Sequence, residues 1–238
     1  TDLIGDTDLR FNSDVSQDID VLFLCVGHGD AKKFLAANPI NENIKIIDLS
    51  QDFRLNANAS FSILDPGLQI KDFIYGLPEL NREAIKTAKN IANPGCFATC
   101  IQLGLLPLAK AGLIKSEVHI NATTGSTGAG QSLSTTSHFS WRNNNLSIYK
   151  AFEHQHLNEI AESLAQATEA SPLGGGLEGA GVGALSFIPQ RGAFPRGILA
   201  SMYLDSDLTL EEAQKLYEDY YKNHAFTHVS RKNIDLKQ

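Results

Sequence analysis

Residues 91–100, IANPGCFATC, place a Pro-Gly turn directly before Cys96 and an apolar, helix-forming run directly after it. This order puts the Cys96 thiol at the start of a helix, where unpaired backbone N–H groups and the helix dipole stabilise a thiolate. A thiolate can act as a nucleophile there, with backbone amides close by to hold an oxyanion. A buried structural cysteine beside a turn explains the same pattern, so position alone leaves both interpretations open.

The other two cysteines have plainer explanations. Cys100 follows Cys96 by one helical turn among apolar neighbours, so we expect it to face the core as a small hydrophobic residue. Cys25 falls within an apolar run and is expected inside a buried strand. We expect no metal site, because the chain has no CxxC pair and the spacing of Cys96 and Cys100 matches no common zinc pattern.

A thiolate nucleophile usually works with a base or a cationic partner, and the segment EHQHLNEI offers two histidines. His154 and His156 stand two residues apart just before a helical pattern, so their imidazoles point in different directions. One can meet Cys96 while the other contacts a substrate. Two exposed surface histidines are the alternative interpretation.

Two further segments carry anion-binding features. The segment TTGSTGAGQS, residues 123–132, is rich in small residues whose amides can bind a phosphate. It matches neither the P-loop motif nor the nucleophile-elbow motif. An ordinary flexible loop is the more frequent explanation of such a composition. In FIPQRGAFPRGIL, Arg191 and Arg196 flank a turn between two predicted strands. Either arginine can bind an anion, and a surface position explains each equally well.

The elements that must position these residues form two groups. Apolar runs at 19–27, 43–50 and 90–93 predict buried strands, with helices between them at about 28–38 and 76–90. This order is typical of a partial Rossmann-type parallel sheet, expected in residues 1–93. Residues 94–238 predict an α+β domain with a mixed, largely antiparallel sheet. Its predicted elements are a helix at 97–112 that Pro107 kinks or splits, a strand at 116–125, a helix at 154–168, a turn-rich link at 172–183, strands at 183–190 and 196–206, and a helix begun by a Thr209–Glu212 capping box.

Composition excludes several classes of partner. The chain has 238 residues and a net charge of −7, with its lysines and arginines scattered, which argues against nucleic acid and anionic membranes as main partners. No apolar run is long enough for a transmembrane helix. Three cysteines make no disulfide framework, so we expect reduced thiols and a cytoplasmic protein.

Taken together, the segments DVLFLCVGHGDA, IIDLSQDFRL, YGLPELNREAI, ANPGCFATC, TTGSTGAG, EHQHLNEI and FIPQRGAFPRGIL closely resemble the N-acetyl-γ-glutamyl-phosphate reductase family of the semialdehyde-dehydrogenase superfamily. The resemblance covers essentially the whole chain. It implies a Rossmann domain joined to a catalytic and dimerisation domain, and reduction of an acyl phosphate by NADPH through a cysteine thioester. It also implies a homodimer or homotetramer.

The resemblance assigns roles to individual residues. Cys96 matches the nucleophile, His156 the acid/base, and His154 a substrate contact. We also expect Arg196 and Asn93 to contact the substrate. The positions expected to face NADP(H) are Gly27, His28, Gly29, Ser126, Gly128 and Gly130. Gln155 and Gln190 depart from the family pattern, which often has Arg and His there.

The family begins with a glycine-rich fingerprint, G-x-G-x-x-G, that holds the cofactor pyrophosphate, and residues 1–93, the predicted Rossmann part, do not contain one. The family also continues beyond the last helix with a segment that returns to the cofactor domain. We therefore expect the 238-residue chain alone to bind NADPH weakly and to show little reductase activity. A fluorescence titration measures this, and micromolar affinity would contradict the expectation.

Two rival interpretations remain open at this stage. One is a neighbouring activity, either an aspartate-semialdehyde-type dehydrogenase or a reductase for another N-acylated acid such as N-succinylglutamyl phosphate. The other is an inactive dimerisation fragment. A Cys/His hydrolase is a poorer third option, because no separate residue that would orient the histidine is identifiable.

Overall fold

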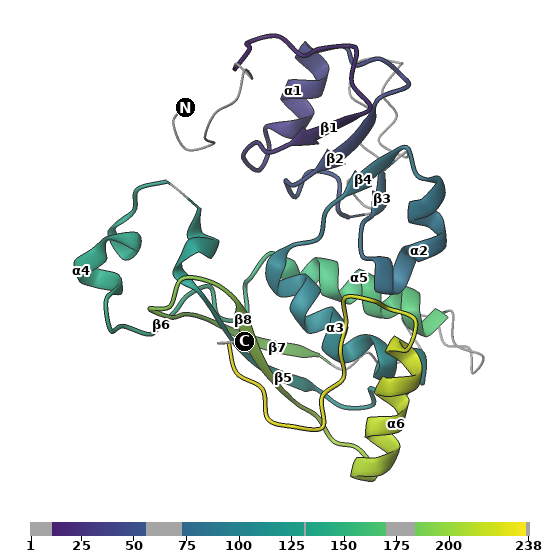
Figure 1. Ribbon diagram of the computed structural model, residues 1–238. Helices are drawn as coiled ribbons and strands as arrows, with labels where there is room; N and C mark the ends of the chain where they lie inside the picture. The colour runs from purple at the N-terminus through teal and green to yellow at the C-terminus, as the bar shows by residue number, and fades with distance from the viewer. Residues whose placement is uncertain (1–10, 56–72, 131, 170–183, 237–238) are drawn as a thin grey trace. The chain divides into compact units, whose positions relative to one another are not determined.

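Two four-stranded sheets organise the chain, each in its own compact unit (Figure 1). The computed structural model describes residues 11–55, 73–130, 132–169 and 184–236. The first unit comprises residues 1–74 and 87–93, and the second comprises residues 75–86 and 94–238. The assignment of residues 1–93 to cofactor binding and of residues 94–238 to catalysis and dimerisation stays a prediction.

The sheet of the first unit has the strand order β1-β2-β4-β3. Strands β1 (Val21–Leu24), β2 (Lys45–Asp48) and β4 (Asn90–Ala92) are parallel, and helix α1 (Ala31–Ala37) connects the first two. The fourth strand, β3 (Phe73–Tyr75), was not predicted. The parallel pairing of β1 with β2 and of β2 with β4 confirms the predicted Rossmann-type parallel sheet.

One prediction about β1 is wrong. The apolar run at 19–27 was expected to form a strand buried on both faces, but the strand covers only residues 21–24, and Phe23 is 58 % exposed. Among the described residues, one face of the strand is packed, with Leu24 against Ala31 and Leu35 of α1. Cys25 lies beyond the end of the strand and is exposed, so it is not the buried residue that was predicted.

The second unit contains a mixed sheet in the order β6-β7-β5-β8. Strand β5 (Val118–Thr124) runs parallel to β7 (Leu185–Arg191) and antiparallel to β8 (Ile198–Tyr203), while the short β6 (Ser147–Ile148) is antiparallel to β7. The mixed sheet confirms the predicted fold class. Strands β7 and β8 are consecutive in the chain but do not pair with each other, because β5 lies between them. The predicted turn-rich link at 172–183 lies outside the described residues.

Helices cover one face of this sheet. The helices of this layer are α2 (Pro78–Thr87), α3 (Cys96–Lys110), α5 (His156–Glu169) and α6 (Leu210–Tyr221). The loop that follows β5 contains the short helix α4 (Phe139–Arg142) and two 3-10 turns, Ser126–Ala129 and Thr135–Ser137. Alternate residues of β5 (Val118, Ile120 and Ala122) pack with α3 and α5 into one core, which makes α3 a rigid support for its first residue. None of the described helices is both long and apolar enough to cross a membrane.

Pro107 lies inside α3 and does not split it, and the predicted kink stays a prediction. The helix continues to Lys110 with Pro107 buried in its last turns. Proline has no N–H, so the carbonyl of Leu103, four residues earlier, loses its helical partner. The hydroxyl of Tyr221 from α6 donates to that carbonyl at 2.5 Å, and Tyr217 donates to the next carbonyl, that of Gly104, at 2.5 Å. The helix therefore tolerates proline because Tyr221 of α6 supplies the donor that Pro107 lacks.

Replacing Tyr221 by Phe is expected to lower the free energy of unfolding by about 1–2 kcal/mol, because the carbonyl of Leu103 is left without a donor inside the protein. Urea titration measures the change. In a Pro107→Ala background the restored amide serves the same carbonyl, so the effect of Tyr221→Phe should shrink to a few tenths of a kcal/mol. Equal losses in both backgrounds would contradict this explanation of the helix.

Candidate functional site

Cys96 is the first residue of α3, as the sequence predicted. Gly95 is the N-cap, with an extended backbone (φ −67, ψ 150), and it contributes no side-chain cap to the helix. The Cys96 side chain is exposed. The thiol therefore lies where the positive end of the helix dipole and the first-turn amides favour an anion, and where a substrate can reach it.

The imidazole of His156 packs directly against Gly95. A Cβ atom added to Gly95 would lie 2.4 Å from Nε2 of His156 and 2.5 Å from Cε1, so only glycine fits at this position. His156 is 6 % exposed and is the first residue of α5. The structure thus places the predicted acid/base beside the residue that precedes the predicted nucleophile, even though 60 positions separate Cys96 from His156 in the chain.

A buried carboxylate connects the two helix starts. Oε2 of Glu159 accepts hydrogen bonds from the amide of Gly95 at 2.9 Å and from the hydroxyl of Tyr75 at 3.0 Å. Its Oε1 lies 3.9 Å from Nε2 of His156. Because Glu159 is 3 % exposed, these contacts fix its position. One side chain therefore holds the backbone before Cys96 and the ring of His156 together.

Glu159 is in turn held by its own neighbours. Nε2 of the fully buried Gln102 donates to the carbonyl of Glu159 at 3.0 Å and to Oγ of Ser163 at 2.9 Å, and it also lies 3.0 Å from Oη of Tyr75. Glu159, Gln102 and Tyr75 were not predicted as site residues from the sequence. A signal for Glu159 was present, because a residue three positions after His156 lies on the same face of a helix.

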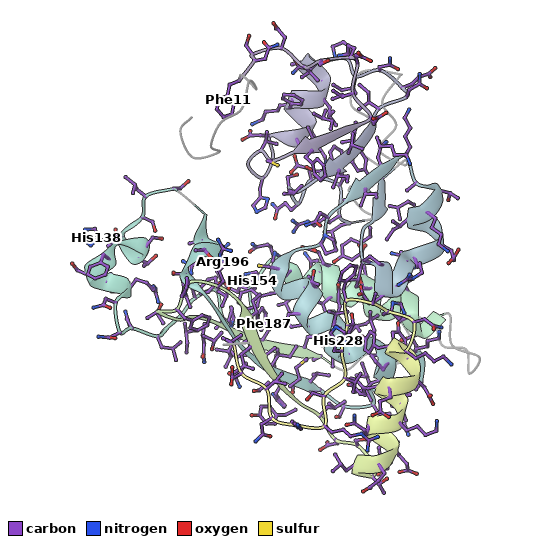
Figure 2. The ribbon with its side chains drawn as sticks, in the orientation of Figure 1. Phe11, His138, His154, Phe187, Arg196 and His228 are labelled. Atoms are coloured by element: carbon purple, nitrogen blue, oxygen red, sulfur yellow. The ribbon has the colours of Figure 1, made fainter. Side chains whose placement is uncertain are left out.

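His154 lies in an aromatic cluster. Its ring is 5.4 Å from that of Phe97, 5.6 Å from that of Phe187 and 5.9 Å from that of Tyr149, and Figure 2 labels His154 and Phe187 in the second unit. Nδ1 of His154 accepts a hydrogen bond from the amide of His156 at 3.2 Å, so His154 caps the first turn of α5. Its predicted role as a substrate contact stays a prediction. The hydrogen bond between Nδ1 of His154 and the amide of His156 also positions His156.

Burial, with the nearby charge of His156 next in importance, lowers the pKa of His154 from its usual value of 6.5 to about 4. Between these values the folded protein binds fewer protons than the unfolded chain, so stability falls as the pH falls through this window. Between pH 7.5 and 5 we expect the wild type to lose about 2 kcal/mol more than a His154→Gln variant. Urea midpoints at the two pH values measure the difference, and parallel losses would refute it.

The glycine-rich loop after β5 is not an open phosphate cradle. The amides of Gly125, Ser126 and Thr127 donate to the carbonyls of Gly197, Phe194 and Pro195, respectively. A Cβ on Gly125 would lie 2.6 Å from the carbonyl oxygen of Pro195, so glycine permits this close approach. These contacts join the loop that carries Ser126, Gly128 and Gly130 to the turn that carries the exposed Arg196, which Figure 2 labels.

In the first unit, the predicted cofactor contacts Gly27, His28 and Gly29 form the loop that follows β1, and all three are exposed. The carboxylate of Asp52 accepts from the amides of Gly29, Ala31 and Lys32, so those amides are already used. Nδ1 of His28 accepts from the amide of Gln51. Asn93 follows β4 and is exposed, and its backbone N–H donates a hydrogen bond to the carbonyl of Asp48.

Cys100 is half-buried one turn after Cys96, and burial raises the pKa of its thiol to about 11. It therefore stays a thiol at neutral pH, as expected for a residue that packs. Among the described residues, no group of three His, Cys, Asp or Glu side chains could hold a metal ion.

Comparison with known proteins identifies the family. The family model described as the semialdehyde dehydrogenase NAD binding domain matches residues 2–88, and the one described as the semialdehyde dehydrogenase dimerisation domain matches residues 96–238. The N-acetyl-gamma-glutamyl-phosphate reductase of Flavobacterium johnsoniae is 54 % identical over 100 % of this chain, which spans 68 % of that protein. The chain belongs to the N-acetyl-γ-glutamyl-phosphate reductase family. The Bacteroides thetaiotaomicron reductase is 53 % identical over 99 % of this chain, which spans 67 % of its length.

Solved structures agree with the fold of this reductase family. Aspartate semialdehyde dehydrogenase II from Vibrio cholerae matches with a TM-score of 0.54 at 15 % identity, over 85 % of this chain and 61 % of that one. Aspartate semialdehyde dehydrogenase with NADP from Candida albicans matches with a TM-score of 0.50 at 14 % identity, over 86 % of this chain and 55 % of that one. These matches confirm the semialdehyde-dehydrogenase fold. With the relatives named above, they make the chain a member of an oxidoreductase family with a domain for a nicotinamide cofactor.

Proposed function

We propose that this chain carries the acyl-transfer site of a reductase of arginine biosynthesis, which converts N-acetyl-γ-glutamyl phosphate and NADPH into N-acetylglutamate semialdehyde, phosphate and NADP⁺. The observation that carries the proposal is the position of Cys96 at the start of α3, with the ring of His156 against Gly95. The identity to reductases along the whole chain supports the choice of substrate.

The first step forms a thioester on Cys96. The sulfur attacks the carbonyl carbon of the acyl phosphate, the C–S bond forms, and the C–O bond to phosphate breaks with its electron pair leaving on phosphate. A thiolate suits this step because it is a good nucleophile and later a good leaving group. First-turn amides of α3 stabilise the oxyanion that develops, an effect worth roughly 3 kcal/mol for one donor in other enzymes.

The second step uses His156 as a proton carrier. NADPH, when bound, supplies the hydride that reduces the thioester carbonyl. His156 donates a proton to the oxygen of the resulting hemithioacetal and takes it back as the C–S bond breaks, which releases the aldehyde and restores the Cys96 thiolate. A histidine in this role typically contributes about 10²–10⁴-fold in rate. Glu159, 3.9 Å from His156, supports the cationic form of the ring and keeps it beside Gly95.

The residues of the first unit fit a dinucleotide. In parallel sheets, ligands bind at the carboxyl ends of the strands, and the exposed loop Gly27–Gly29 follows β1 at that end. Glycine at position 27 leaves the backbone open to a ligand. Because Asp52 already holds the amide of Gly29, we expect Gly27 and the ring of His28 to contact the cofactor.

We also propose a cytoplasmic homodimer or homotetramer. The face of the second sheet opposite α3 and α5 carries exposed side chains, including Leu199 and Tyr203 of β8. Exposed Leu199 and Tyr203 lie there beside the polar Asn121 and Ser201, and such a mixed, uncovered face suits a contact between copies. The family model that matches this part of the chain is described as a dimerisation domain. All three cysteines are free thiols, which suits a reducing compartment.

Rapid mixing with N-acetyl-γ-glutamyl phosphate in the absence of NADPH tests the proposal. We expect about one equivalent of phosphate per chain in a fast phase and an acyl adduct on the peptide that contains Cys96. N-succinylglutamyl phosphate, compared in parallel, distinguishes the acyl group. Cys100→Ser is the matched control and should give the same adduct. If phosphate is released with no adduct at Cys96, the thioester route is wrong.

A further inference from the structure

Arg191, the last residue of β7, carries a positive charge that no described side chain neutralises. Among the described residues no carboxylate lies within ion-pair distance of it. Its Cζ lies 4.6 Å from the ring centroid of Tyr149, a cation–π contact. Its Nε is buried and donates no hydrogen bond to a described residue. Because an unmet buried donor costs free energy, a ligand oxygen there would be bound favourably.

The Tyr149 ring connects this arginine to the candidate active site. It lies 5.9 Å from the ring of His154 and 6.5 Å from that of Phe97, the residue after Cys96. Burial raises the pKa of Tyr149, Arg191 opposes that change through its charge and a hydrogen bond, and a Cys96 thiolate adds to it. The hydroxyl of Tyr149 therefore lies within electrostatic reach of both the guanidinium and the predicted nucleophile.

A second arginine adds positive charge and fixes the backbone. Nη1 of Arg142, which is 6 % exposed, donates to the carbonyl of Arg191 at 2.6 Å. Its other acceptors are neutral as well: the carbonyls of Thr136 and Asn145, and Oγ of Ser147. Ser147 also pairs with Arg191 across β6 and β7. The guanidinium of Arg142, which has no counter-charge among the described residues, therefore binds the backbone of Arg191 and adds positive charge at this end of the sheet, which favours an anion there.

We propose that Arg191 and Tyr149 form an anion subsite beside Cys96 that binds an oxyanion of the substrate, either its phosphate or its α-carboxylate. The inference rests on the proposed function, in which the substrate carries both groups. The planar guanidinium fork binds two oxygens of one oxyanion, and the tyrosine hydroxyl donates to a third position. Arg191 is then a binding residue in addition to the expected Arg196.

Alkylation of Cys96 by iodoacetamide, followed by mass spectrometry, tests the subsite without requiring reductase activity. Inorganic phosphate and N-acetylglutamate are the two protecting probes. In the wild type each probe that enters the subsite slows alkylation. In Arg191→Met, we expect the protecting concentration to rise roughly ten-fold or more, the usual effect of losing a hydrogen bond to a charged group. A rise for phosphate alone assigns the phosphate, and a rise for N-acetylglutamate alone assigns the carboxylate. A rise for both means that either oxyanion occupies the subsite.

Two control variants keep the test decisive. Arg231→Met removes an exposed guanidinium that pairs with Glu218, and it should leave protection unchanged. Arg191→Lys keeps the charge but loses the fork, so it should weaken protection by an intermediate factor even if Arg191→Met folds poorly. If neither Arg191 variant changes protection by either probe, the subsite is wrong.

The two proposals fail in different ways. If no acyl adduct forms on wild-type Cys96, the proposed function is wrong whatever Arg191 does. If the adduct forms and the Arg191 variants are protected like the wild type, only the subsite is wrong. In a full-length reductase, Arg191→Met should raise KM at least about ten-fold while alkylation of Cys96 without a probe stays within two-fold.

Discussion

Replacing Cys96 by serine is expected to reduce reductase turnover by at least about 10⁴-fold. A serine hydroxyl at the start of α3 is not ionised at neutral pH, and an oxygen ester on it would be a poor substitute for a thioester, since an alkoxide leaves less readily than a thiolate. The exposed side chain carries no packing role, so the unfolding midpoint should change little. Phosphate-dependent turnover of a full-length enzyme measures the effect.

Cys100→Ser is the matched control for this substitution. It makes the same chemical change one helical turn further on, where burial raises the pKa of the thiol to about 11 and keeps it protonated. Turnover should stay within a few-fold of the wild type. Near-normal turnover in Cys96→Ser, or an equal loss in both variants, would show that the acyl group is not carried on Cys96.

Replacing Gly95 by alanine is expected to lower turnover by about 10²–10⁴-fold, the range that general acid–base catalysis contributes. The added methyl group would lie 2.4 Å from Nε2 of His156, closer than atoms can approach, and the ring is buried, so it cannot keep its position beside Gly95. Either the ring rotates away from Cys96 or the start of α3 shifts and the 2.9 Å bond from Gly95 to Glu159 breaks. Both outcomes separate the nucleophile from its proton carrier.

Gly104→Ala provides the control for Gly95→Ala. Its added Cβ would lie 2.1 Å from the terminal methyl of Met202, an even closer contact, but the flexible methionine side chain can rotate out of the way. Turnover should therefore change little, although the free energy of unfolding falls by about 1–3 kcal/mol. If Gly95→Ala were as active as Gly104→Ala, the contact between His156 and Gly95 would have no part in catalysis.

Sequence patterns of short range predicted the local structure well. The Pro-Gly pair before an apolar run placed the start of α3 at Cys96, and Thr209 with Glu212 forms the expected capping box of α6. The apolar spacing in residues 154–168 predicted α5, whose Ile160 and Leu164 are fully buried. Each of these signals depends on residues within one or two helical turns, where backbone geometry alone determines which side chains meet.

Contacts between distant segments escaped prediction. Glu159 meets Gly95 and Tyr75 across 64 and 84 positions, and no local spacing indicates which buried polar groups will pair. The loop at 125–127 looked rich in free amides, but its partners lie near residue 195, in another turn. The hydrogen-bond partners of buried polar groups depend on the whole fold, because tertiary packing decides which acceptor lies next to each buried donor.

Tyr221 of α6, which donates to the carbonyl left open by Pro107, has a consequence for how this family can change over time. Pro107 alone would leave the carbonyl of Leu103 without a donor, and Tyr221 alone would bring a second donor to a carbonyl that its own helix already satisfies. Each residue is therefore acceptable mainly in the presence of the other. Substitutions at these two positions should be inherited as a pair, with a tyrosine on α6 wherever the nucleophile helix carries a proline.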